Sequence, residues 1–442
     1  MIFSSVEFIL FFLTFIVLVK YFRNYQREVI IVTSFIFYSF WSPIFFFLLL
    51  YLCLSNYFFI KFNVKLKFAI SLTLVPLFYF KYSLFFIKLA NLESLNKYAY
   101  SDELPLAISF ITFTAIATII DTKLKRHDEN LNFKNFTEFL VYFPQLIAGP
   151  ILRVKELVPQ LKEKLSINKS NIKFGLTLFT VGFIKKIFFA DSIAGYIDPF
   201  FEGSMSNPDG IIKSFLLFPL QIYFDFSGYV DMALGASIIL GINLPQNFNK
   251  PYLSTSLTDF WRNWHITLSS WFRDYLYIPL GGSRKSKHNL FFNLILVMSA
   301  AGLWHGASLN FILWGFLNGF VLFLEKIFGK YFNFPSFLKI VFTCFIIFNL
   351  WIVFRINDFP QLIKFIYELY SNLNRLYSLE NLLTLCILIF GIFTQRFDNF
   401  NNIKNFSKNI PLYIIVPFIF IIILTGLGMN AGSSDKFIYF QF

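Results

Sequence analysis

Charged residues are scarce in this sequence of 442 residues. Asp, Glu, Lys and Arg together make up 14% of the chain, against about 25% in an ordinary soluble domain. Hydrophobic residues make up 57%, and Phe alone occurs 66 times. A water-soluble globule cannot cover so much apolar side chain with polar surface, so the composition predicts a membrane protein.

Cysteines and familiar catalytic motifs are also few. The three cysteines, Cys53, Cys344 and Cys386, lie inside apolar runs without C-x-x-C spacing, which argues against a disulfide framework and a thiolate metal site. The sequence has no G-x-S-x-G, H-E-x-x-H or Walker motif, so serine-hydrolase, zinc-protease and ATPase functions lack support. No Gly/Ser linker appears. We therefore predict a single membrane-embedded domain over residues 1–442, with no metal and no resident cofactor.

The chain is instead rich in continuous apolar runs. A helix needs roughly 20 apolar residues to cross the hydrocarbon of a bilayer, and many stretches come near this length. The runs do not alternate with polar residues, which excludes an outer-membrane barrel. We predict an all-α, polytopic fold with about ten to twelve crossings. Pro144, Gly149 and Pro150 interrupt one run and permit a re-entrant segment.

The distribution of charge predicts how the chain is oriented. The net charge of +13 would suggest nucleic acid in a soluble protein, but the bases cluster in loops between apolar runs, so membrane lipids are the expected contact. Segments 121–173 and 244–288 each carry a net charge of +4 and are predicted to be cytoplasmic, whereas 191–210 has four acids and no base. This alternation requires one net crossing in 211–243, predicted as a helix broken around Asp225 to Gly228, and it places the tail 429–442 outside.

Polar residues gather in the segment 244–288, which is too long to be a simple connector. It contains Trp261, Arg262, His265, Arg273 and Asp274. Polar groups at membrane depth are tolerated only when they are paired or line a cavity, so this composition predicts a buried, wet pocket. An amphipathic segment at the lipid headgroups is the alternative. Lys185 and Lys186, in an apolar run, are interpreted as lining a cavity or extending toward the headgroups.

Two of the four histidines stand out because each follows a tryptophan. His265 occurs in WRNWH, and His305 occurs in GLWHGAS between two strongly apolar runs. An imidazole has a pKa near neutrality, which suits it to take a proton from a hydroxyl or a thiol. From spacing alone, a core histidine satisfied by hydrogen bonds is the competing interpretation.

Five stretches together resemble the bacterial membrane-bound O-acyltransferases of the AlgI and PatA type. The resemblance covers most of the chain and is dense from about 105 to 320. The matching stretches are SFITFTAI (109–116), FPQLIAGPILR (143–153), QIYFDFSGYVDMALG (221–235), LPQNFNKPYLSTSLTDFWRNWHITLSSWFRDYLYIPLGG (244–282) and GLWHGASLNFILWG (302–315).

The resemblance implies a membrane-bound O-acyltransferase fold with a central tunnel, located in the bacterial inner membrane. Through it, an acetyl group from cytoplasmic acetyl-CoA, the donor substrate, would reach an extracytoplasmic acceptor. His305 matches the essential histidine of the family, and His265 matches its second tunnel histidine. The implied partner is a separate extracytoplasmic SGNH-type O-acetyltransferase that modifies a cell-envelope polysaccharide. Because the chain ends soon after its last apolar run, peptidoglycan is expected ahead of alginate or another exopolysaccharide.

The chemistry of thioester transfer assigns roles to the individual residues. His305 is the expected base, and His265 or an indole N–H is expected to stabilise the oxyanion, with Trp261 and Trp304 in the substrate site. The CoA phosphates need cations, for which the cytoplasmic loop offers Arg262, Arg273, Arg284, Lys285 and Lys287. Arg284 and Lys285 are favoured, because charges on an exposed loop can follow a mobile ligand. Ordinary anchoring on the cytoplasmic side is the alternative for these cations.

The C-terminal FIYFQF places Tyr439 on the predicted external side, where its phenol is expected to accept and relay the acyl group. An aromatic plug or interface anchor is the alternative role. For the whole protein, two other functions stay open: export of a polysaccharide or lipid-linked sugar, and D-alanyl transfer as in the teichoic-acid system. An exporter would be expected to show internal inverted repeats and no dependence on His305.

Overall fold

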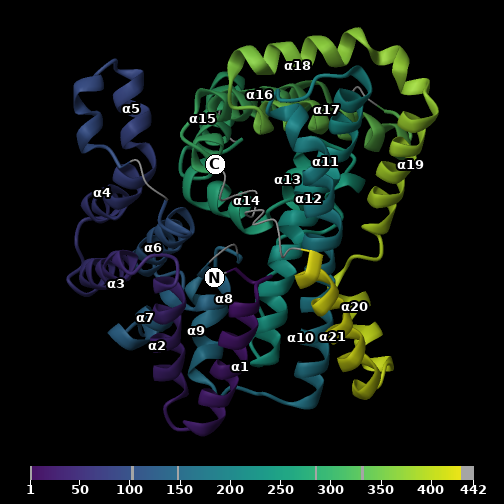
Figure 1. Cartoon of the computed structure of the whole chain (residues 1–442). Helices are drawn as coiled ribbons and strands as arrows, with labels where there is room; N and C mark the ends of the chain where they lie inside the picture. The colour runs from purple at the N-terminus through teal and green to yellow at the C-terminus, as the bar shows by residue number, and fades with distance from the viewer. Residues whose placement is uncertain (1, 101–103, 147–148, 284–285, 330–332, 430–442) are drawn as a thin grey trace. The chain divides into compact units, whose positions relative to one another are not determined.

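The computed structural model describes residues 2–100, 104–146, 149–283, 286–329 and 333–429. Within these ranges the chain is built from helices and their connections, and its β structure is an isolated bridge between Phe248 and Trp264 (Figure 1). This confirms the all-α fold class. The chain forms two compact units that interleave along the sequence. The prediction of one domain over 1–442 stays a prediction.

The first unit comprises residues 2–183, 229–245 and 407–428. In it, α2 packs against α3 and α7, and α4 packs against α6 (Figure 1). Its helices are α1 (Val6–Tyr21), α2 (Gln26–Ser39), α3 (Ile44–Lys61), α4 (Leu66–Leu77), η1 (Phe78–Tyr82), α5 (Ser83–Leu89), η2 (Glu93–Tyr98), α6 (Ile108–Lys123), α7 (Phe133–Val141), α8 (Phe143–Leu146), α9 (Val154–Lys162), α10 (Lys169–Ile184) and α21 (Leu412–Met429).

An aromatic cluster holds the interrupted apolar run of the first unit. The run breaks between α7 and the short α8, close to Pro144, whereas Gly149 and Pro150 follow α8. The buried ring of Phe143 contacts the rings of Phe11, Phe15 and Phe37, with centroids 5.3, 5.1 and 5.5 Å away. Such tilted and edge-to-face contacts are favourable beyond the area they bury. The abundant phenylalanine thus packs α8 onto α1 and α2.

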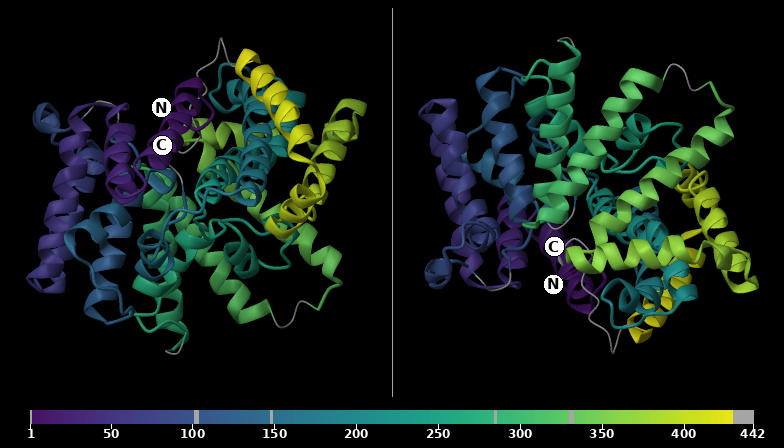
Figure 2. Two further views of the ribbon diagram at one scale, coloured as in Figure 1. Left: turned by 90° about the horizontal axis from the view of Figure 1, so that it is seen from below. Right: turned by 90° about the horizontal axis from the view of Figure 1, so that it is seen from above.

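The second unit comprises Ile184–Gly228 and Gln246–Phe406. Its α15 and α16 form a hairpin whose arms lie side by side (Figure 2). Its helices, of which α12 and α20 end in the first unit, are η3 (Lys185–Asp191), α11 (Ser192–Phe201), α12 (Pro208–Ile239), η4 (Pro251–Leu253), α13 (Leu257–Asn263), α14 (Ile266–Phe272), η5 (Arg273–Tyr277), α15 (Lys287–His305), α16 (Leu309–Phe328), α17 (Ser336–Arg355), α18 (Phe359–Ser371), η7 (Leu373–Tyr377), α19 (Leu379–Thr394) and α20 (Phe400–Asn409).

Five helical stretches in the described part of the chain are long and apolar enough to cross a membrane. They are Ile44–Lys61, Leu66–Leu89, Leu309–Phe328, Ser336–Arg355 and Leu412–Met429. Their surfaces expose large apolar side chains such as Phe47, Phe342 and Phe418, which lipid tails would cover. The protein is a multi-pass membrane protein, and the count of ten to twelve crossings stays a prediction.

The predicted break at Asp225 to Gly228 is wrong. The helix α12 runs without interruption from Pro208 to Ile239. Asp225 is buried, and its carboxylate lies 2.7 Å from the ammonium of Lys186, so an ion pair satisfies this charge and no unwound backbone is needed. The sequence predicts a break there because the partner of Asp225 is 39 positions away and cannot be identified from composition.

Candidate active site

The hairpin of α15 and α16 positions His305. The histidine is the last residue of α15, and the chain turns at Gly306 before Ser308 caps α16 by accepting a hydrogen bond from the Asn310 amide. The two arms approach closely because glycines face the opposing backbone. A Cβ at Gly302 would lie 2.0 Å from the carbonyl oxygen of Phe311. The glycine before the Trp–His pair therefore serves close helix packing.

Aromatic rings and a pocket surround the His305 imidazole. The imidazole makes edge-to-face contacts with Trp304, Trp314 and Phe354, with centroids 5.0, 5.4 and 5.1 Å away. The same side chain lines a pocket of about 130 Å³. A single water needs only about 10–15 Å³, so the pocket has room for a small ligand group. His305 therefore borders an open space and is not sealed among hydrocarbon side chains.

The pocket combines apolar walls with a few polar groups, and all of its lining residues belong to the second unit. Its polar or amphipathic lining residues are Trp261, Ser269, Arg273, Tyr277, His305 and Trp314. They come from α13, α14, η5, α15 and α16. A mostly apolar pocket with a small number of convergent polar groups and a histidine is typical of a catalytic site.

The second histidine, His265, is held by the segment that precedes it. It adopts a left-handed backbone with φ of 43° where it caps α14. The Ile266 amide donates to the Asn247 carbonyl (3.0 Å), and the Thr267 amide and hydroxyl both donate to the Asn247 side chain (3.1 and 2.7 Å). The LPQNFNK motif thus fixes the position of His265.

Trp304 connects the two histidines. The His265 ring lies 5.9 Å from that of Trp304, which is itself 5.0 Å from His305, and Phe226 covers another side of His265 at 4.7 Å. The structure thus brings His265, Trp304 and His305 together, although His265 and Trp304 are not among the residues that line the pocket. Trp261 lines the same pocket as His305.

The helix carrying Trp261 is anchored to α16 by a carboxylate. Glu325 accepts hydrogen bonds from the amides of Leu257 (2.7 Å) and Thr258 (3.2 Å) at the start of α13. A negative charge is favourable at the N-terminus of a helix. This contact fixes the helix on which Trp261 enters the pocket.

The predicted cations differ in their positions. Arg273 lines the pocket, with its guanidinium mostly exposed and 2.8 Å from the Asp274 carboxylate. Arg262 is exposed at the end of α13. Arg284, Lys285 and Tyr439 lie outside the described residues, so their roles stay predictions.

Comparison with known proteins identifies the chain. The model of the membrane-bound O-acyltransferase (MBOAT) family matches residues 36–357. The chain belongs to the membrane-bound O-acyltransferase family. The probable alginate O-acetylase AlgI of Pseudomonas putida is 33% identical over 100% of both chains, and the peptidoglycan O-acetyltransferase of Helicobacter pylori is 36% identical over 80% of this chain and 76% of its own length. The teichoic acid D-alanyltransferase of Bacillus subtilis is 29% identical over 52% of this chain and 62% of its own length.

These similarities make the protein a membrane-bound O-acyltransferase. A polytopic exporter, the alternative from another class, is not supported by this membership. Within this O-acyltransferase, sequence reasoning singled out neither Trp314 nor Phe354, which flank the His305 ring. Trp314 stands in GLWHGASLNFILWG, so its place in the same motif was the available signal.

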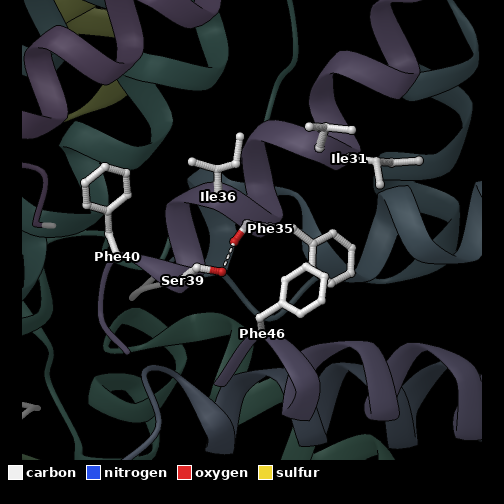
Figure 3. A pocket seen from close by; sticks show the side chains of 7 residues that line it. Ile31, Phe35, Ile36, Ser39, Phe40 and Phe46 are labelled. Carbon is white, nitrogen blue, oxygen red and sulfur yellow. Dashed lines mark hydrogen bonds between the residues drawn. The ribbon is translucent and has the colours of Figure 1, made fainter. Parts of the chain in front are cut away.

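A second pocket of the O-acyltransferase has a different character. It lies in the first unit beside α2 and the start of α3 and measures about 620 Å³. Ile31, Ile36, Phe40 and Phe46 line it, and the hydroxyl of Ser39 is turned back to donate to the Phe35 carbonyl at 2.8 Å (Figure 3). None of its lining residues is ionisable. This second pocket therefore offers no side chain for acid–base chemistry.

We expect the stability of the O-acyltransferase to depend on pH through His265. Burial lowers the pKa of His265 from 6.5 to about 3. Between these values the unfolded chain binds a proton that the folded chain does not, so stability falls by about 1.4 kcal/mol for each pH unit below 6.5. Melting temperatures in detergent should therefore drop less between pH 7 and pH 5 for His265→Gln than for the unmodified protein.

The exposed His288 provides the control for this measurement. His288→Gln should keep the full acid sensitivity of the unmodified protein, because it leaves the buried His265 in place. An acid sensitivity unchanged in His265→Gln would show that His265 is not held neutral by burial.

Proposed function

We propose that this O-acyltransferase transfers acetyl groups from cytoplasmic acetyl-CoA to an acceptor on the other side of the inner membrane. The observation that carries the proposal is the His305 imidazole on the wall of a pocket large enough for a small acyl group. Acetyl-CoA is a substrate in this scheme, and no resident cofactor is needed. The predicted tunnel would continue this pocket toward both faces.

His305 acts as the general base in the proposed reaction. Its imidazole takes the proton from the acceptor hydroxyl, whose oxygen attacks the thioester carbonyl. Burial keeps His265 neutral near pH 7. Its ring contacts the Trp304 ring and so positions that side chain next to His305. Arg273 at the pocket, together with Arg262, Arg284 and Lys285, would bind the CoA phosphates.

The relatives support acetyl as the transferred group. The probable alginate O-acetylase of Pseudomonas putida and the peptidoglycan O-acetyltransferase of Helicobacter pylori each match 80% or more of this chain and are named as O-acetyl-transferring proteins, whereas the D-alanyltransferase matches 52% of it. D-alanyl transfer is therefore the second candidate. We favour peptidoglycan as the final polymer, in line with the Helicobacter pylori relative, with alginate or another exopolysaccharide as the alternative. An extracytoplasmic SGNH-type O-acetyltransferase would complete the transfer.

The donor can be tested directly with purified protein in detergent. Incubation with radiolabelled acetyl-CoA should release CoA and acetylate a hydroxyl acceptor, whereas a D-alanyl thioester should give little turnover. Faster turnover of the D-alanyl thioester would replace acetyl by D-alanyl as the cargo. If neither thioester is consumed, the proposed donor class is wrong.

We further propose that Tyr439 relays the acetyl group by forming a phenolic ester. Tyr439→Phe removes the hydroxyl and should abolish transfer to the partner while leaving the release of CoA by a small hydroxyl acceptor intact. Intact-mass analysis of the C-terminal peptide should show an added acetyl group in the unmodified protein. A fully active Tyr439→Phe variant with an unmodified peptide would exclude the relay. Tyr377→Phe, at an exposed tyrosine in the second unit, is the matched control.

A further inference from the structure

Two buried indole N–H groups at the pocket have no hydrogen-bond acceptor among the residues that the structure describes. They belong to Trp261 and Trp314, both of which line the pocket with His305. The Trp314 side chain is 1% exposed. A buried donor without an acceptor destabilises the folded protein, and such a group requires an explanation when it occurs at a pocket.

A neighbouring tryptophan shows that an indole N–H in this aromatic cluster can find a hydrogen-bond acceptor. Trp351 stacks on Trp314, with centroids 6.0 Å apart, and its own N–H donates to the Tyr252 hydroxyl at 3.1 Å. The packing is therefore compatible with a paired indole N–H one ring away from the pocket. Trp261 and Trp314 line the pocket, whereas Trp351 is not one of its lining residues.

Trp314 also lies next to the proposed base. The two rings meet at right angles with centroids 5.4 Å apart, and the Trp261 ring contacts Trp314 from another side at 5.6 Å. A thioester carbonyl placed in the pocket beside His305 is thus adjacent to both tryptophans. Neutral N–H donors suit this task because they stabilise developing negative charge and do not compete with the base for protons.

We propose that Trp314 is a catalytic residue whose indole N–H donates to the thioester carbonyl oxygen, with Trp261 as the second donor. This inference rests on the proposed function. The acceptor O–H proton passes to the imidazole of His305, and the freed oxygen forms a C–O bond to the carbonyl carbon. The carbonyl π pair moves onto its oxygen, which the indoles stabilise. When the C=O bond re-forms, the C–S bond breaks, and the CoA thiolate takes the proton from the imidazolium.

Trp314→Phe tests the role because it keeps an aromatic ring and removes the N–H. We expect kcat to fall by about 100-fold, as for the loss of one oxyanion donor, while the KM for acetyl-CoA changes little. The affinities for two CoA analogues separate loss of the N–H from a change in packing, because a packing defect should weaken both analogues equally. One is the CoA ketone in which a methylene replaces the thioester sulfur, and the other is S-ethyl-CoA, which lacks the carbonyl.

The variant should bind the CoA ketone about 3- to 10-fold more weakly and bind S-ethyl-CoA with unchanged affinity. Trp351→Phe is the matched control, since its N–H is already paired, and it should leave the ratio of the two affinities unchanged. If Trp314→Phe does not fold, benzothienylalanine at position 314 preserves the bicyclic shape without the N–H and should give the same result.

An unchanged affinity ratio with normal kcat in the Trp314 variant would overturn the assignment while leaving the proposed function intact. An unmodified protein that binds neither analogue and does not turn over acetyl-CoA would overturn both.

Discussion

Replacement of His305 by Gln is expected to reduce acetyl transfer by about 10²- to 10⁴-fold, the range for loss of a general base. Glutamine keeps a polar side chain of similar reach but takes up no proton near neutral pH. His305 is 6% exposed and packs among three aromatic rings, so the substitution changes the chemistry more than the outline of the site. The loss should appear in kcat rather than in the KM for acetyl-CoA.

The variant must be shown to be folded for this result to count. Binding of the CoA ketone should be retained in His305→Gln, because the base is not needed for binding. His127→Gln is the control: this histidine contacts the Thr122 hydroxyl at 3.0 Å in the first unit and has no assigned role in transfer. Normal turnover in His305→Gln would remove the base from the mechanism.

Replacement of Lys186 by Met is expected to have the largest effect on stability. The Lys186 ammonium lies 2.6 Å from Asp191 and 2.7 Å from Asp225, and all three side chains are less than one-tenth exposed. Removing the lysine leaves two carboxylates buried without their cation, which costs about 3–5 kcal/mol. The melting temperature and the yield of folded protein in detergent should both fall sharply.

Two further variants separate charge burial from loss of a side chain. Lys213→Met breaks an ion pair with Glu380, whose side chain is 74% exposed, and should cost only about 0–1 kcal/mol. Adding Asp225→Asn to Lys186→Met removes one of the stranded charges and should restore part of the lost stability. Equal destabilisation by Lys186→Met and Lys213→Met would contradict a buried charge network.

The composition was sufficient to predict the fold class, and the motifs singled out site residues whose roles stay predictions. Continuous apolar runs require helices in a bilayer, and the Trp–His pairs at 265 and 305 marked polar groups that need a pocket. In the structure, Trp304 contacts both histidines. The fold class and these candidate residues were accessible from the sequence because each depends on a local pattern.

What could not be predicted depends on contacts between distant positions. The helix α12 continues through Asp225 because this residue pairs with Lys186. The place of Trp314 beside His305 depends on a ring contact across the α15–α16 hairpin. In the sequence alone, Lys186 is an isolated charge in an apolar run, and Trp314 is one of many apolar residues. Only the arrangement in space distinguishes the paired indole of Trp351 from the indoles at the pocket.

Transfer of acetyl across a sealed membrane is the decisive test of the proposed function. Purified protein is reconstituted in liposomes with radiolabelled acetyl-CoA on the outside and a small hydroxyl acceptor trapped in the lumen, and the His305→Gln protein serves as the blank. We expect acetyl ester on the lumenal acceptor with the unmodified protein and none with the blank. Acetylation confined to an acceptor on the same side as acetyl-CoA would contradict it.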